Sequence, residues 1–295
     1  MDYFTPLPGL DQPVDFSSST LLLPQPSLAS LAQLSTDLIV SNFHLVRIGY
    51  LGLRDHVPAV SGLDSLPGDD LEGISYSVEV FQTPSKSLTV VLPRSPVIRA
   101  RRLHYLHSMR NFIEQGRFKH VLVVAGVDAA LRTDEGLNSS SPLRHYLLPS
   151  PSSPTSATTT SHLDLSSVST PYSTLTSSSS IPLIPHGGLT RNLLETLSSA
   201  SSSAALPPVS ALLIYTFESA EPETAFYLAD ALAHVLREEL QALEERVEKL
   251  NLGGDGPEEE RAGATPRIKW KVPKSWETGL MGPELGLDSR TELFG

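Results

Sequence analysis

The residues best placed to do chemistry lie at 185–192, with the sequence Pro-His-Gly-Gly-Leu-Thr-Arg-Asn. Apolar residues follow at helical spacing, so the paired glycines run into an expected helix. Backbone N–H groups at such a junction can hold an anion, which makes His186, Gly187, Gly188 and Thr190 a candidate anion loop. The structural alternative is that the glycines permit a tight turn and close packing while Thr190 caps the helix.

His186-Gly187-Gly188 is also similar to the oxyanion loop of esterases. Acyl hydrolysis of that kind needs a serine on a nucleophile elbow. The pattern G-x-S-x-G does not occur in the sequence, which argues against this class of enzyme.

Two other sets of polar residues are weaker candidates. His104 and His107 stand three apart in a helical pattern and could face one way, but no H-E-x-x-H pattern accompanies them. Asp128 and Asp134 follow an apolar run that ends at Gly126, where an α/β fold often places its active site. We expect an exposed helix face for the first set and a solvated loop for the second, with no metal or cofactor at either.

The composition excludes several classes. The chain has 295 residues, a formal charge of −11 and no cysteine, so it has no disulfide, no thiolate zinc site and no cysteine nucleophile. The acidic balance argues against nucleic-acid binding, and the cluster Arg99, Arg101 and Arg102 is typical of a solvated face or a partner contact. We expect no secretion signal and no membrane span, and therefore a soluble intracellular protein.

The hydrophobic pattern predicts the elements that position these residues. Strands are expected at 20–23, 45–51, 74–80, 88–92, 120–125 and 209–217, and helices at 27–43, 97–116, 189–197 and 223–250. This order predicts an α/β fold, a three-layer α/β/α domain with a mixed sheet.

Composition also divides the chain into regions. A single domain is expected over 16–252, interrupted at about 150–180 by a disordered insertion rich in Ser, Thr and Pro. A flexible linker is expected at 253–267. The final segment, 268–295, carries both tryptophans and is expected to pack in part on the domain and to end as a free tail.

Several segments together resemble the proteasome assembly chaperone 2 family, in a divergent, fungal-type form. They are Leu21–Pro24 with Leu31–Ile39, Ile48–Tyr50, Pro142–Leu148, His186–Thr190 and Lys269–Trp276. The Trp-x-x-Pro-x-x-Trp block is the most distinctive of them. The match extends over nearly the whole chain except the serine-rich insertion.

The resemblance implies a non-enzymatic chaperone of the cytoplasm and nucleus. Members of the family pair with a related partner, of the proteasome assembly chaperone 1 type, and hold the α-ring of the 20S proteasome during assembly. The resemblance also implies a core of the nucleoside phosphorylase type, without a cofactor, a nucleic acid or a membrane as partner.

The family further implies a role for the C-terminal tripeptide. Its members use a hydrophobic residue, a tyrosine and any third residue to insert between α-subunits, and the matching positions here are Leu293, Phe294 and Gly295. Phe294 departs from the pattern because it lacks the phenolic hydroxyl. Loss of that hydroxyl costs about 0.5–1.5 kcal/mol if it is hydrogen-bonded in the pocket. An apolar pair beside a free α-carboxylate suits a pocket with a lysine and an apolar slot.

Two other functions stay open from the sequence alone. One is a phosphorylase-like or hydrolase-like enzyme that uses the His186-Gly187-Gly188 loop as an anion site. The other is a general adaptor whose serine-rich insertion is the regulated element.

Overall fold

The structure is a computed structural model. It describes residues 3–10, 13–69, 73–132, 141–149, 163–172, 181–199, 206–217, 222–240 and 268–278. The predicted linker at 253–267 and the tripeptide 293–295 lie outside these ranges.

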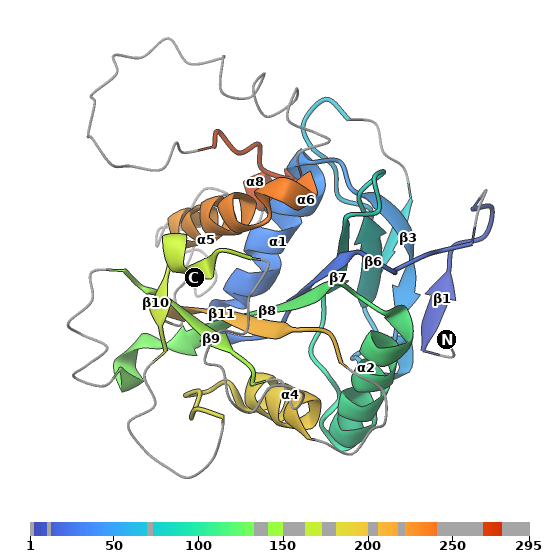
Figure 1. The fold of residues 1–295 in the computed structure, drawn as a ribbon. Helices are drawn as coiled ribbons and strands as arrows, with labels where there is room; N and C mark the ends of the chain where they lie inside the picture. The colour runs from blue at the N-terminus through green and yellow to red at the C-terminus, as the bar shows by residue number, and fades with distance from the viewer. Residues whose placement is uncertain are drawn as a thin grey trace, which may run out of the picture.

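A nine-stranded mixed sheet forms the centre of the described domain (Figure 1). Neighbouring strands are parallel in the middle, where β2 pairs with β7 and β8, and β8 pairs with β11. Both ends contain antiparallel pairs. In spatial order the strands are β1 (Phe4–Pro6), β3 (Val46–Leu51), β6 (Val78–Gln82), β7 (Leu88–Pro93), β2 (Thr20–Pro24), β8 (His120–Asp128), β11 (Val209–Thr216), β9 (Leu143–Leu147) and β10 (Thr170–Pro171).

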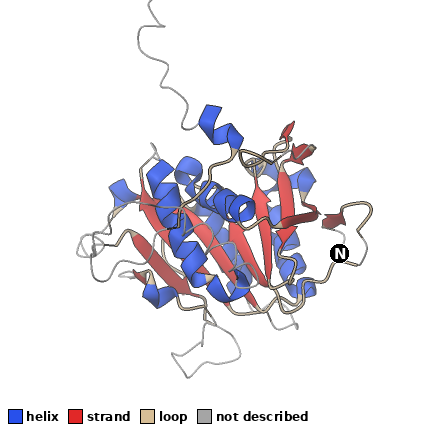
Figure 2. Ribbon diagram, turned by 90° about the horizontal axis from the view of Figure 1, so that it is seen from above, coloured by secondary structure: helices blue, strands red, loops and turns tan. Residues whose placement is uncertain are grey.

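Helices cover both faces of this sheet. On one face lie α1 (Leu31–Asn42), α5 (Pro222–Val235) and α6 (Arg237–Leu240), and on the other lie α2 (Arg102–Gly116) and α4 (Gly188–Ser198). Figure 2, seen from above, shows the helices lying over the strands. The predicted three-layer α/β/α class with a mixed sheet is therefore confirmed.

The central strand β8 shows why the sheet needs helices on both sides. Its side chains alternate between the two cores, with Leu122 and Val124 packed under α1 and α5, and Val121 and Val123 packed under α2 and α4. A strand buried on both faces has a continuous apolar sequence, and residues 120–125 have that pattern.

The structure differs from the predicted elements at the start of α1. The expected helix at 27–43 begins at Ser27, but the Ser27 hydroxyl accepts a 2.8 Å hydrogen bond from the backbone N–H of Gly126. Ala29 and Ser30 then adopt positive φ angles of 57° and 53°, and α1 begins at Leu31. The chain is therefore bonded to β8 at Ser27, and α1 begins four residues later at Leu31.

Three other expectations also need correction. The strand predicted at 74–80 divides into β5 (Ile74–Tyr76) and β6, and β5 pairs with β4 (Val60–Gly62) as a separate two-stranded ribbon. The helix predicted at 223–250 is interrupted between α5 and α6, and residues 241–250 lie outside the description. The strand β1 was not predicted because its three residues are too few to show a period.

Part of the expected disordered insertion is also packed. Residues 163–172 form a short 3-10 helix (Leu165–Ser167) and β10, which pairs with β9. Leu163 and Leu165 are buried in the core under α5. The prediction is wrong for this stretch because two leucines supply apolar burial that the average composition of the insertion hides. The rest of 150–180 lies outside the described residues, so the prediction of disorder stays untested there.

Candidate functional site

The predicted loop at 185–192 begins with a tight turn that leads into α4. The Gly187 N–H donates to the Ile184 carbonyl at 3.0 Å, and His186 has a φ of 54°. A Cβ at Gly187 would lie 2.2 Å from Cγ2 of Ile184, so a larger residue does not fit there. Thr190 is buried inside α4 and does not cap it, because Gly187 occupies the N-cap position.

A carboxylate beside this loop opposes its use as an anion site. Oδ2 of Asp128, at the end of β8, lies 3.1 Å from Nδ1 of His186. Nη2 of Arg102 donates to the Gly188 carbonyl at 2.5 Å, so this guanidinium is already engaged by the protein. An incoming anion would meet the Asp128 carboxylate, which argues against the enzymatic alternative.

The histidines of α2 have separate surroundings. Nδ1 of His104 lies 2.9 Å from Oδ2 of Asp55, and His107 is exposed. Among the residues that the structure describes, no group of three or more His, Asp or Glu side chains could hold a metal ion. Asp134 lies outside those residues.

Asp55 instead links the N-terminal strand to α2. Its carboxylate is buried and accepts from the Tyr3 hydroxyl at 3.0 Å and from Nε of Arg101 at 2.6 Å. Burial alone would raise the pKa of Asp55, but the hydrogen bonds from His104, Arg101 and Tyr3 outweigh it and hold the pKa below its ordinary value. Burial, and next the nearby Asp55 charge, raise the pKa of Tyr3. This cluster fixes β1 to the domain.

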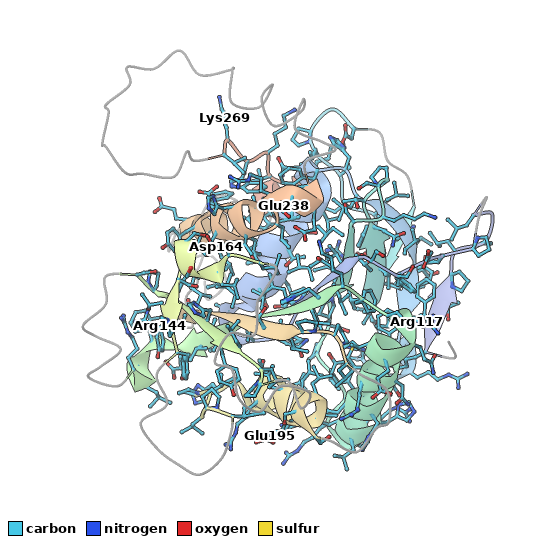
Figure 3. All side chains as sticks on the ribbon, in the orientation of Figure 1. Arg117, Arg144, Asp164, Glu195, Glu238 and Lys269 are labelled. Atoms are coloured by element: carbon cyan, nitrogen blue, oxygen red, sulfur yellow. The ribbon has the colours of Figure 1, made fainter. Side chains whose placement is uncertain are left out.

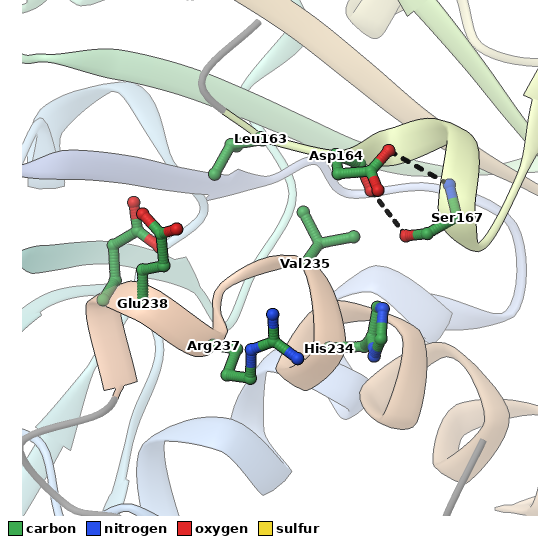
Figure 4. A pocket seen from close by; sticks show the side chains of 8 residues that line it. Leu163, Asp164, Ser167, His234, Val235, Arg237 and Glu238 are labelled. Atoms are coloured by element: carbon green, nitrogen blue, oxygen red, sulfur yellow. Dashed lines mark hydrogen bonds between the residues drawn. The ribbon is translucent and has the colours of Figure 1, made fainter.

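The cleft drawn in Figure 4 lies between the 3-10 helix at Leu165–Ser167 and the junction of α5 with α6. It has a volume of about 90 Å³, whereas sites for small organic ligands usually have about 300–1,000 Å³. Glu239 lines it with 4% of its surface exposed, and Oε1 accepts from the Thr20 hydroxyl at 2.9 Å. Asp164 accepts from the Ser167 N–H at 3.3 Å. A cleft of this size is too small for such a ligand, so we do not assign it a substrate.

The C-terminal segment 268–278 lies across α1 and α5. Nε1 of Trp270 donates to Oδ1 of Asp230 on α5 at 2.8 Å. Asn42 at the end of α1 makes two bonds to the backbone of Lys271, at 2.8 and 2.9 Å. The expectation that this segment packs in part on the domain holds for these residues.

The two tryptophans of this segment pack on aromatic side chains of the domain. Trp276 is only 3% exposed and its ring centroid lies 6.1 Å from that of Phe226. Trp270 meets Phe43 at the same separation of 6.1 Å. The alternating lysines point outward, and Figure 3 shows Lys269 on the outer side of the segment. Trp-x-x-Pro-x-x-Trp is therefore an anchoring motif.

The same segment also contacts the loop that joins β4 to β5. The Lys274 N–H donates to the Ser65 carbonyl and Nζ of Lys274 to the Asp69 carbonyl, each at 3.0 Å. The backbone and hydroxyl of Ser275 both donate to the carboxylate of Asp64. Sequence reasoning missed Asp64, Asn42 and Asp230 because each bond spans far-separated parts of the chain.

Comparison with known proteins gives consistent relatives. No family model matches the chain. Proteasome assembly chaperone 2 of Mus musculus is 26% identical over 265 residues, which cover 89% of this chain and 91% of the mouse protein. Proteins of the same name from Nematostella vectensis and Xenopus laevis are 34% and 30% identical over 136 and 137 residues. Those two matches span about half of each relative, 55% and 52%.

Solved structures share the fold. Pyrococcus furiosus PbaA, an archaeal homolog of proteasome-assembly chaperone, matches with a TM-score of 0.52 and 11% identity over 80% of this chain and 92% of that chain. PbaB of the same organism, an archaeal proteasome activator, matches with a TM-score of 0.50 and 11% identity over 85% and 97%. The curated relatives and the shared fold together confirm the resemblance of this chain to the proteasome assembly chaperone 2 family.

Proposed function

We propose that this chain is a proteasome assembly chaperone that pairs with a related companion chaperone and binds α-subunits of the 20S proteasome while the ring assembles. The observation that carries the proposal is the similarity to the mouse chaperone along 89% of this chain. The role is non-enzymatic, in agreement with the chaperone names of the relatives, and its place of action is the cytoplasm and nucleus.

The anchored C-terminal segment supports the part of the proposal that concerns α-subunits. Because both tryptophans and Asn42 fix 268–278 on α1 and α5, the chain continues from a defined point on the domain. We assign the contact with α-subunits to Leu293, Phe294 and Gly295, as in the family pattern. A tripeptide of this kind binds weakly alone, and its attachment to a docked domain raises its effective concentration at the pocket.

Recovery of free α-subunits by the immobilised chain tests this assignment. Leu293→Ala is expected to lower recovery because it removes half of the apolar pair, whereas Phe294→Tyr is expected to maintain or raise it. The matched control is Leu287→Ala, the same change in the same final segment but outside the tripeptide. Equal recovery by all variants overturns the assignment of the tripeptide, and failure of the wild-type chain to recover any α-subunit overturns the proposed function.

None of the helices in the described ranges has the length and apolar character needed to cross a bilayer.

A further inference from the structure

The two-stranded ribbon of β4 and β5 lies beside the central sheet and has two different faces. Val60 pairs directly with Tyr76, and Gly62 pairs with Ile74. Side chains two apart in a strand lie on the same face. Ile74, Tyr76 and Val60 therefore share one face, and Ser75 lies on the other.

The inner face of the ribbon is polar. The Ser75 hydroxyl donates to Oε2 of Glu79 at 2.8 Å, and Nη1 of Arg47 donates to the Ile74 carbonyl at 2.7 Å and to Oε1 of Glu79 at 2.6 Å. Nε of Arg94 completes the network with a 2.9 Å bond to Oε2 of Glu79. The Glu79 side chain is fully buried, and its carboxylate is paired with both guanidinium groups beneath the ribbon.

The outer face of the ribbon is apolar and exposed. Val60 is 68% exposed, Ile74 49% and Tyr76 36%. The Tyr76 ring stands edge-on to Tyr50, with centroids 4.9 Å apart, and the guanidinium of Arg47 lies 5.7 Å from the Tyr50 ring. Tyrosine, arginine and aliphatic side chains gathered in one patch are typical of the centre of a protein interface.

The ribbon places its polar face inward and its apolar face outward, which is the reverse of the arrangement expected for a ribbon in contact with water alone. A ribbon with one face on its own domain and the other in water buries its apolar side chains and exposes its polar ones. Here a serine and a buried ion network are inside and two aliphatic residues and a tyrosine are outside. A two-stranded ribbon has little stability by itself, and the bonds to Glu79 and Arg47 hold it in place with this outer face formed before any partner arrives.

The net charge of the chain indicates whether a second copy of the chain or a different protein is the more suitable partner. A second copy of this chain would bring another −11 of formal charge to the contact, which opposes association. An exposed apolar patch suits a lasting contact with a different protein more than a transient encounter, which is usually more polar. A stable interface needs about 800 Å² on each side, so neighbouring exposed residues such as Val57 would have to contribute.

We infer that the outer face of the β4–β5 ribbon, formed by Val60, Ile74 and Tyr76, binds a second, different protein chain through an apolar surface. This inference rests on the proposed function in one respect, because that function identifies the second chain as the companion chaperone. The loop that joins β4 to β5 also contacts the C-terminal segment, so the bound chain would lie next to the point from which the C-terminal residues continue.

Co-purification of the companion chaperone, co-expressed with this chain, tests the inference. The variant Val60→Asp/Ile74→Asp places two carboxylates where the partner would exclude water, and we expect pairing to weaken about a hundredfold or more. The matched control is Leu183→Asp. Leu183 is 67% exposed, and its carbonyl accepts from Tyr172 next to β10, at the opposite end of the sheet from β3. The control is expected to pair like the wild type, and melting temperatures verify that all three chains fold.

The outcomes separate the inference from the proposed function. If the wild-type chain and the double variant pair equally well, the ribbon inference is overturned and the proposed function stands. If the wild-type chain binds no companion, pairing in the proposed function fails, and light scattering on the chain alone decides about the ribbon. Two results would overturn binding of a different partner. In one, the wild-type chain forms a homodimer that the double variant does not form. In the other, the wild type and the double variant are both monomers. Loss of α-subunit recovery with intact pairing also overturns it, since the ribbon would then face the α-ring.

Discussion

The β4–β5 ribbon and the C-terminal segment 268–278 contact each other but orient their side chains in opposite ways. The segment buries Trp276 against Phe226 and turns its lysines outward. The ribbon turns Ser75 inward to Glu79 and leaves Val60 exposed. The segment is thus stabilised by its own domain, whereas Val60 and Ile74 of the ribbon remain largely exposed to solvent.

Removal of the Trp276 side chain is expected to have the largest effect. Trp276→Ala leaves a cavity between the segment and α5 and should lower the free energy of unfolding by about 3–5 kcal/mol, if the segment unfolds together with the domain. Chemical denaturation measures this, and hydrogen exchange at 268–278 reports whether only the segment detaches. Lys269→Ala, an exposed change in the same segment, is the control. A loss below about 1 kcal/mol with full protection of the segment would contradict the anchoring role.

Removal of the charge beneath the ribbon is expected to rank second. Glu79→Gln leaves Arg47 and Arg94 without their shared buried carboxylate and should cost about 2–4 kcal/mol of unfolding free energy. Denaturation measures the total loss. Faster proteolysis within 60–76 would show that the ribbon loosens first. Unchanged stability would mean that the ribbon is held by other contacts.

Asp37 provides a matched control for Glu79. Its carboxylate also pairs with Arg94, at 3.2 Å, yet burial raises the pKa of Asp37 above its ordinary value. A raised folded pKa favours the protonated form in the folded state, so the ionised carboxylate costs stability at neutral pH and this cost disappears as the pH falls below the unfolded value. Asp37→Asn is therefore expected to cost less than Glu79→Gln, and to change the slope of stability against pH above about 4. A loss of unfolding free energy for Asp37→Asn that equals or exceeds the loss for Glu79→Gln would contradict this ranking.

A smaller effect is expected from the hydrogen bond that Trp270 makes to α5. Trp270→Phe keeps an aromatic ring against Phe43 but removes the donor to Asp230, and should cost about 1–2 kcal/mol because the acceptor is charged. Denaturation of this variant beside Trp276→Ala separates the polar contribution from the apolar one. A cost equal to that of Trp276→Ala would show that the hydrogen bond is as important as the packing.

The sequence predicted the central fold well because its signals are local. The apolar run at 120–125 and the helical spacing in 97–116 correspond to β8 and α2. The resemblance of 269–276 to a known family also identified a segment that the structure places on α1 and α5. In each case neighbouring residues carry the pattern, so no knowledge of distant contacts was needed.

Most of the incorrect predictions have the same physical origin, which is contacts between residues far apart in the sequence. The period-two pattern at 74–80 could not show that Ser77 would accept from the Ala59 N–H and donate to the Val57 carbonyl, which separates β5 from β6. Nor could it show which side of β5 would meet Glu79. Thr190 was expected to cap α4, but the turn fixed by Gly187 and Ile184 starts the helix earlier. Leu163 and Leu165 were hidden in a stretch of average polar composition.

The smallest effect is expected from Val60→Asp in the isolated chain, and it sharpens the contrast between the two regions. Val60 is 68% exposed, so an aspartate there meets water and should change the free energy of unfolding by no more than about 0.5 kcal/mol. The same denaturation experiment that shows a large loss for Trp276→Ala should therefore show almost none here, although both changes remove an apolar side chain. A loss above about 1.5 kcal/mol would mean that Val60 packs on its own domain. The apolar outer face of the ribbon would then be part of the core, and no second protein would be needed to explain it.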